Sequence, residues 1–383
     1  MQTTEDGEIY SRAMDIIGSI TSDFNSAYYE EILGELEVKW SEDRKFNARA
    51  FSNGDLNNPP QHNILFFYET ARRIYRDGEA LYEFISGPVK EYENTFRSLN
   101  FGDASFNFEF HEREHFVNNF FAAGITYLFG HEIGHLIQEH THIRSQFGGA
   151  NAADLAIDES DASNSNQELT QDQSVIWHVT ELAADHEAVS WCLSEIFRHV
   201  VISQENPKEL DLIDEEHGRL FMENSLIFAL AMTCVHFRFN GIKAITPAET
   251  PVGSHPHPML RIELNIFQLI GGLDFYKRAF KMNFSKKEIS LYINKGVTAA
   301  NILWVNDYFE PERNKVELIV GGVINHNNTK KYLKPIISKW DQISDYVESI
   351  KRFKTVEFGD KNSQDFGMMF FDEHFRNTFV ENK

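Results

Sequence analysis

The segment that most constrains this chain is 120–142, FFAAGITYLFGHEIGHLIQEHTH. Up to its first histidine almost every residue is apolar or small, which is typical of a helix buried on all sides. His131 and His135 stand one helical turn apart, so their imidazoles project from one face and can share a metal ion. Glu132 lies about a hundred degrees further round the helix, where its carboxylate can take a proton from metal-bound water. The fold must therefore place a further ligand against this buried helix.

The same HExxH pattern occurs a second time, as HEREH at residues 111–115. This copy places Arg113 and Glu114 between its histidines, and such charges are rarely buried without a partner. It follows the segment 106–110, whose alternation of Phe with polar residues predicts a strand. We therefore interpret residues 111–115 as a solvated junction between a strand and the buried helix, and not as a metal site.

A catalytic zinc site needs a third protein ligand. An HExxHxxGxxH arrangement is excluded, because the required Gly and His positions hold Gln138 and Thr141. The better candidate is Glu181, in the strongly helical run WHVTELAAD, with Asp185 one turn later. Glu181 is expected to bind the metal, and Asp185 to accept a hydrogen bond from the second ring nitrogen of a ligand histidine. The alternative is an amphipathic helix whose two acids face water.

The two helices that carry these residues are expected to lie close together. Ala184 and Ala188 share one side of the second helix, and their small side chains would let the two backbones approach. Just after the HEIGH motif, His140 and His142 are out of step with the ligand face. We expect these two histidines to end the first helix, where cations interact favourably with the helix dipole.

Together these motifs resemble the gluzincin branch of zinc metallopeptidases, and most closely its M48 family (the Ste24/HtpX type). HEIGH followed by ELAAD is similar to the two metal-bearing helices of that branch. SHPHPMLR is similar to the family's His–Pro pair and the Arg that follows it, which here are His255 and Arg261. NARAF at residues 47–51 is similar to the strand ahead of the catalytic helix. The resemblance covers roughly residues 46–262, and the membrane helices usual in that family are missing.

The resemblance implies a zinc metallopeptidase that hydrolyses peptide bonds and carries one Zn²⁺ per chain. The implied ligands are His131, His135 and Glu181. Glu132 would act as the general base, His255 would lie near the substrate carbonyl, and Arg261 would brace the site. The expected fold class is α+β and mainly helical, with a zincin-like metallopeptidase core, a small sheet and a helical C-terminal extension.

Two other functions fit the same residues. HExxH followed by ExxAD is also similar to cytosolic regulatory proteases of the ImmA/IrrE type, which cleave a repressor, and to phage-exclusion proteases such as Lit. The third interpretation is a zincin-like fold that binds a partner without turnover. An intact Glu132 argues against that third interpretation, because a chain released from catalysis has no need of a carboxylate there.

Composition and charge limit the classes of molecule that the protein can bind. The net charge of −22 disfavours nucleic acid and anionic membranes, which require a basic surface. No signal peptide is visible at the start of the sequence, and no apolar run reaches the ~20 residues that span a bilayer. Cys192 and Cys234 lie in apolar helical surroundings and are expected to be buried thiols. We therefore expect a soluble, cytoplasmic protein that acts on a protein or peptide substrate.

Three regions are expected along the chain. Residues 1–45 form an N-terminal helical segment, with helical spacing over 7–40; residues 46–271 form the zincin-like catalytic domain; residues 272–383 form a helical extension or small domain. Within the second region, residues 145–173 have few large apolar side chains and predict a mobile loop, either an inert insertion or a lid over the cleft. Strands are expected at 46–51 and 62–67, and helices at 69–84, 175–201, 215–239, 284–304 and 328–353.

Overall fold

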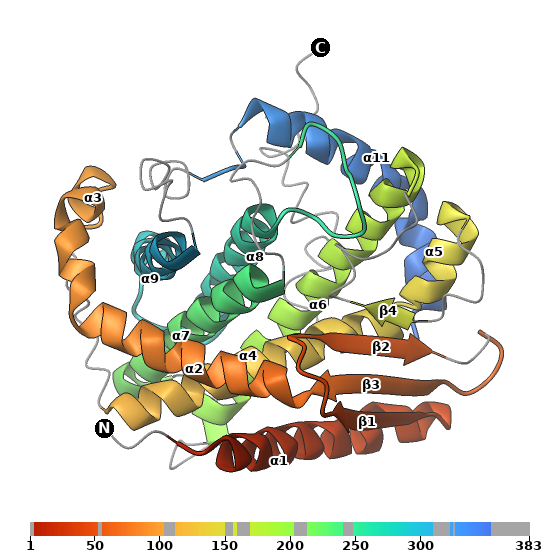
Figure 1. Cartoon of the computed structure of the whole chain (residues 1–383), viewed down its shortest axis with the longest axis horizontal. Helices are drawn as coiled ribbons and strands as arrows, with labels where there is room; N and C mark the ends of the chain where they lie inside the picture. Colours follow the sequence, from red (N-terminus) through yellow and green to blue (C-terminus); the bar gives the residue numbers. More distant parts are fainter. Residues whose placement is uncertain are drawn as a thin grey trace.

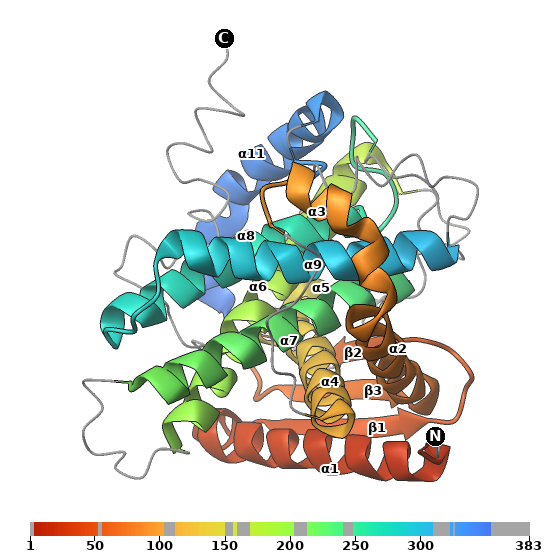
Figure 2. The ribbon, with the colours of Figure 1, turned by 90° about the vertical axis from the view of Figure 1, so that its left-hand side faces the viewer.

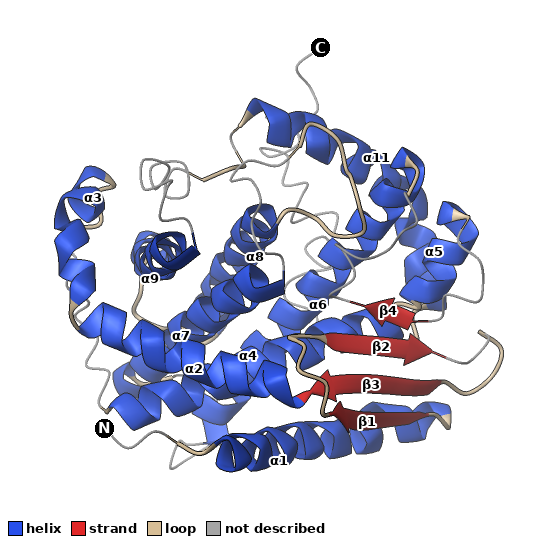
Figure 3. Cartoon of the chain, viewed as in Figure 1, coloured by secondary structure: helices blue, strands red, loops and turns tan. Residues whose placement is uncertain are grey.

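The computed structural model describes residues 4–52, 56–102, 112–149, 156–158, 169–202, 213–239, 248–308, 322–324 and 326–353. Over these ranges the fold is α+β and mainly helical, which confirms the predicted class. Long helices cross one another, and one small sheet lies along their side (Figures 1 and 3). The helices are α1 (Asp6–Phe24), α2 (Tyr68–Ser86), α3 (Glu93–Ser98), α4 (Arg113–Ile137), α5 (His140–Gly148), α6 (Gln171–Ile202), α7 (Glu215–Phe239), α8 (Pro258–Ala279), α9 (Lys286–Tyr308) and α11 (Asn327–Ile350).

Within the described residues the sheet has four strands: β1 (Glu35–Ser41), β2 (Ala48–Ser52), β3 (Gln61–Phe67) and β4 (Ala156–Asp158), in the order β1-β3-β2-β4. β1 runs parallel to β3, whereas β2 is antiparallel to both β3 and β4. Alternate residues of β2 are buried, and β2 packs against α4. Helix α1 lies along β1 at the opposite edge (Figures 1 and 2). The sheet therefore supports α4, the helix that carries His131 and His135, from one side.

Strand β1 corrects the prediction of helical spacing over residues 7–40. Helix α1 ends at Phe24, and two short helical turns lead to Leu33, whose left-handed backbone (φ 56°) reverses the chain. The segment that follows, ELEVKWS, alternates apolar and polar residues with the period of a strand. The prediction continued the regular apolar spacing of α1 past Phe24 and so missed the change to the period of a strand.

The prediction of a mobile loop over 145–173 is wrong for part of that range. Residues 145–148 belong to α5, and residues 171–173 begin α6. Ala156–Asp158 is strand β4, which pairs with the outer edge of β2. Backbone hydrogen bonding to a sheet edge does not require large apolar side chains, so composition alone did not indicate this strand. The rest of the loop, and the predicted strand at 106–110, lie outside the described residues.

Helices α4 and α6 are in close backbone contact. A Cβ atom added to Gly134 would lie 2.9 Å from Cα of Ala184, and one added to Gly130 would lie 3.2 Å from Cα of Ala188. The predicted role of the two alanines is therefore confirmed, and glycines on α4 complete the contact. This short distance between the helices lets side chains of α6 reach the histidines of α4.

Helix α7 lies deep in the helical layer. It has the length and apolarity of a membrane-crossing helix, alone among the described residues, but 83% of its apolar window is buried inside the protein. Cys192 on α6 and Cys234 on α7 are free and buried, as expected. One cluster of buried apolar side chains extends from Ile9 on α1 to Val347 on α11. The predicted helices at 69–84, 175–201, 215–239, 284–304 and 328–353 are all present, and the boundaries of the three predicted regions stay predictions.

A candidate metal centre

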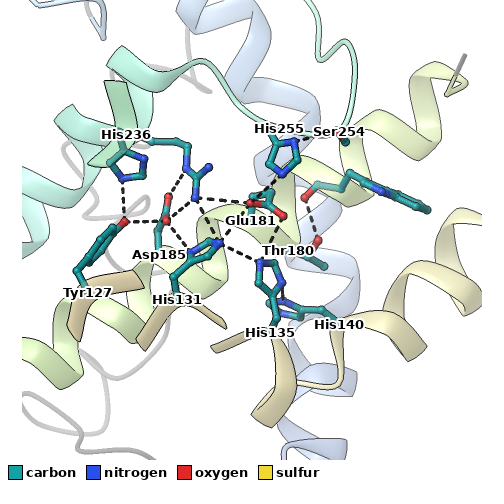
Figure 4. A network of polar contacts seen from close by, with 12 residues as sticks. Tyr127, His131, His135, His140, Thr180, Glu181, Asp185, His236, Ser254 and His255 are labelled. Carbon is teal, nitrogen blue, oxygen red and sulfur yellow. Dashed lines mark hydrogen bonds and ion pairs between the residues drawn. The ribbon is translucent and has the colours of Figure 1, made fainter. Parts of the chain in front are cut away.

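Three potential ligands come together between α4 and α6 (Figure 4). Nε2 of His131 lies 3.0 Å from Nε2 of His135. The two oxygens of Glu181 lie 3.5 Å from Nε2 of His131 and 3.4 Å from Nε2 of His135. One donor atom from each residue lies within 4.8 Å of the others, and all three residues are buried. These donors can therefore hold a single metal ion.

The helix geometry explains this convergence. His131 and His135 lie one turn apart on α4 and face α6, where Glu181 and Asp185 are also one turn apart. Glu132 is fully buried in the same turn of α4. The close contact of the two backbones then brings both pairs of side chains within hydrogen-bonding range.

Asp185 lies behind the His131 ring, where the sequence analysis expected a partner. Its Oδ1 is 2.9 Å from Nδ1 of His131, on the side of the ring opposite the other ligands. Arg261, from α8, donates to the same carboxylate from Nε and Nη2, at 2.7 Å each. Burial alone would raise the pKa of Asp185, but the charge and hydrogen bonds of Arg261 outweigh it and hold that pKa well below its usual range. The carboxylate is therefore ionised and fixed.

The segment before α8 brings His255 to the centre. Nε2 of His255 lies 3.8 Å from Oε2 of Glu181, and its Nδ1 is 2.8 Å from the hydroxyl of Ser254. Arg261 also reaches Glu181, with Nη2 3.5 Å from Oε2. The structure thus brings together six of the residues that were predicted for the site, namely His131, His135, Glu181, Asp185, His255 and Arg261. The seventh, Glu132, is buried next to His131 in α4.

Two buried residues of α5 complete the centre, and sequence reasoning missed both. Arg144 donates from Nη2 to Oε1 of Glu181 at 2.7 Å and from Nε to the hydroxyl of Thr180 at 2.8 Å. Its guanidinium carbon lies 5.3 Å from the centre of the Trp177 ring. His140 is the other residue, with Nδ1 2.8 Å from Nδ1 of His135. The sequence analysis expected His140 at the end of the preceding helix and assigned no role to Arg144.

The position of His140 corrects the expectation that it ends the helix that carries His131 and His135. Helix α4 ends at Ile137, and Glu139 adopts a left-handed conformation (φ 51°) that turns the chain. His140 then begins α5 and faces back toward the ligands. Burial lowers the pKa of His140 well below its usual value, so the ring is neutral. No Gly, Asn or Pro marks this turn, which is why the sequence did not indicate it.

A second polar group supports Asp185 from the far side. The hydroxyl of Tyr127 donates to Oδ1 of Asp185 at 2.9 Å and lies 2.8 Å from Nε2 of His236. Asn265 donates to the same hydroxyl at 3.0 Å. Burial raises the pKa of Tyr127, so the phenol stays protonated and remains a donor. Tyr127 precedes His131 by one helical turn, a spacing that could have identified it.

The described residues of the HEREH segment, 112–115, take no part in this centre. His115 is exposed and lies at the start of α4, with Nε2 3.0 Å from the amide of Asn119. Arg113 pairs with Glu79 at 3.0 Å, and His111 lies outside the described residues. In the part of the chain that the structure describes, no second group of His, Cys, Asp and Glu has metal-binding spacing.

Comparison of the chain with protein-family models, with curated proteins and with solved structures found no match.

Proposed function

We propose that the protein is a zinc-dependent metalloendopeptidase of gluzincin type. The observation that carries the proposal is the convergence of His131, His135 and Glu181, with Glu132 buried next to His131 in α4. Two imidazole nitrogens and one carboxylate oxygen are a ligand set that zinc takes in catalytic sites. When bound, zinc would polarise the scissile carbonyl and bring the pKa of a water toward ~7.

The side chains of this chain would divide the remaining work. Glu132 would accept a proton from the attacking water and deliver it to the leaving amine. His255 would donate from Nε2 to the developing oxyanion, because its Nδ1 can accept from Ser254. Loss of such a donor typically lowers the rate by about a hundredfold or more. Asp185 and Arg261 would hold the His131 ring in the orientation that binding requires.

The substrate class follows from the same chemistry. An activated water beside a general base suits the hydrolysis of peptide bonds in a protein or peptide. The net charge of −22 supports a soluble protein without a nucleic-acid partner, and we propose a cytoplasmic location. His255 and Arg261 both lie in the centre, which favours the M48-like arrangement over the ImmA/IrrE or Lit types.

The proposal is tested with Glu132→Gln. The amide keeps the shape of the side chain but cannot accept the water proton, so zinc content should stay near one per chain while proteolysis falls by orders of magnitude. New protein N-termini in cells that express the wild type, absent with Glu132→Gln, would identify the substrate. Equal cleavage by both proteins, or purified wild type that neither retains nor takes up zinc, would contradict the proposal.

A further inference from the structure

The second proposed ligand, His135, is in contact with another histidine, His140. Nδ1 of His135 and Nδ1 of His140 are 2.8 Å apart, and both rings are buried. Two ring nitrogens at this distance share one proton, so one of them donates and the other accepts. Nε2 of His135 faces the other two ligands, so a lone pair is needed there and the proton of His135 belongs on Nδ1. His140 must therefore accept through its own Nδ1.

The contacts on the other side of the His140 ring independently require that its Nδ1 be the acceptor. Nε2 of His140 lies 3.1 Å from Oε1 of Gln138. The amide nitrogen of Gln138 lies 3.1 Å from Oε1 of Glu187 and 3.4 Å from the carbonyl oxygen of Ala183. Both of these oxygens are acceptors, and Glu187 is also paired with Lys351. The amide must therefore turn its nitrogen to Glu187 and its oxygen to His140, which places the His140 proton on Nε2.

We propose that His140 is a positioning residue for the ligand His135, and that Gln138 and Glu187 fix its tautomer. The sequence of donors, from His135 to His140 to Gln138 to Glu187, favours the His135 proton on Nδ1 and directs the lone pair of its Nε2 toward Nε2 of His131 and Oε1 of Glu181, where a metal ion would bind. The inference rests on the proposed function only in taking His135 to be a metal ligand. The two proposed ligand histidines thus differ in the group that accepts their Nδ1 proton. For His131 the acceptor is the charged carboxylate of Asp185, and for His135 it is the neutral ring of His140.

Zinc affinity, measured by competition with a chelator, tests the proposal in the full-length protein. His140→Leu removes the acceptor and should weaken zinc binding about 10–100-fold, the usual effect of losing such a partner. His140→Asn can place an amide oxygen where Nδ1 was and should recover most of the affinity. The matched control is His142→Leu on the same helix. His142 contacts Gln146 and Tyr346, so its replacement should leave zinc affinity unchanged.

The metal-free protein gives a second readout that does not depend on catalysis. In ¹⁵N-histidine NMR spectra, His140 should be the Nε2–H tautomer and His135 the Nδ1–H tautomer. Glu187→Gln can donate as well as accept, so it should allow the amide of Gln138 to turn and should produce a second His140 tautomer. These spectra also decide the matter if His140→Leu fails to fold.

The outcomes separate this inference from the proposed function. If wild-type protein binds zinc but cleaves nothing, while the His140 variants weaken binding as expected, only the proposed function fails. If His140→Leu binds zinc as tightly as wild type, or His140 is the Nδ1–H tautomer in the metal-free protein, the inference is overturned and the peptidase proposal stands. Wild type that binds no zinc would overturn both.

Discussion

Glu181 is a buried carboxylate between two arginines, and this charge balance has consequences for the metal-free protein. Arg144 donates to Oε1 at 2.7 Å, and Arg261 lies 3.5 Å from Oε2. A buried carboxylate is strongly unfavourable without a compensating charge. The arginines provide that charge without a metal, and a bound cation would share the role. The stability of the protein and its affinity for metal are therefore coupled at this residue.

Arg144→Ala tests this coupling. Removing one partner of a buried pair typically costs ~3–5 kcal/mol, so the metal-free variant should unfold at clearly lower denaturant concentration. Saturating zinc should restore most of the loss, because a ligand that binds only the folded state stabilises it and here also neutralises Glu181. The control is Arg97→Ala, which breaks an exposed pair with Glu93 and should change the stability by less than ~1 kcal/mol. Equal destabilisation of Arg144→Ala with and without zinc would contradict the coupling.

Glu181 and Asp185 are expected to differ in their effect on metal binding. Glu181→Ala removes a proposed metal ligand together with its charge and should empty the site. Asp185→Ala removes a partner of His131 and should weaken binding about 10–100-fold, so that zinc still binds at high supply. Zinc affinities of the two variants provide the measurement. If Asp185→Ala lost more zinc affinity than Glu181→Ala, Asp185 would be the metal ligand and Glu181 the supporting residue.

The sequence predicted the residues of the centre better than their surroundings. His131, His135, Glu181 and Asp185 follow from helical spacing, which depends only on backbone geometry. Arg144 and His140 do not, because the reversal at Glu139 is a left-handed residue with no sequence mark. Both residues lie on α5, a separate helix that was not predicted and whose last residues, 145–148, were expected to belong to a loop.

At the scale of elements, the contact between α4 and α6 decides whether the ligands meet. Gly134 faces backbone atoms of Ala184, and a backbone contact cannot be relieved by a change of rotamer. The boundaries of α7 at residues 215–239 were predicted as they are observed, since an apolar periodicity over a long helix is a strong signal. Strand β1 was missed because its pattern is short and follows a strongly periodic helix. Long elements are thus better specified by local sequence than short ones.

Gly134→Ala should separate the two helices. Its methyl group would lie 2.9 Å from both Cα and the carbonyl oxygen of Ala184, so the backbones must move apart. We expect a loss of stability of ~1–3 kcal/mol, together with weaker zinc binding, because Glu181 moves with α6. The control is Gly18→Ala on α1, where no atom lies within 4 Å and helix propensity predicts a gain of up to ~1 kcal/mol. Unchanged zinc affinity in Gly134→Ala would show that the site tolerates a wider separation.

After α11 the chain returns to α4, the helix that carries His131 and His135. The backbone N–H of Arg352 donates to the carbonyl oxygen of Ile137, the last residue of α4, at 2.9 Å. Its guanidinium pairs with Glu139 and donates to the carbonyl oxygen of Asn58 at 3.1 Å. Phe353 stacks on Tyr28, with ring centres 4.9 Å apart. These contacts hold the turn that presents His140, so residues far along the chain fix the geometry behind a ligand.

Arg352→Ala should loosen that turn. The variant leaves Glu139, which is 3% exposed, without its guanidinium partner, and a buried group that loses a charged hydrogen bond typically costs about 1–3 kcal/mol. Because the damage is centred on the end of α4, backbone amides of residues 137–140 should exchange with solvent faster than those in the middle of α7. Lys331→Ala, which breaks an exposed pair with Glu249, should alter neither stability nor exchange. If exchange at residues 137–140 stays as slow as in wild type, the turn is held by α4 and α5 alone, and the segment after α11 has no part in positioning His140.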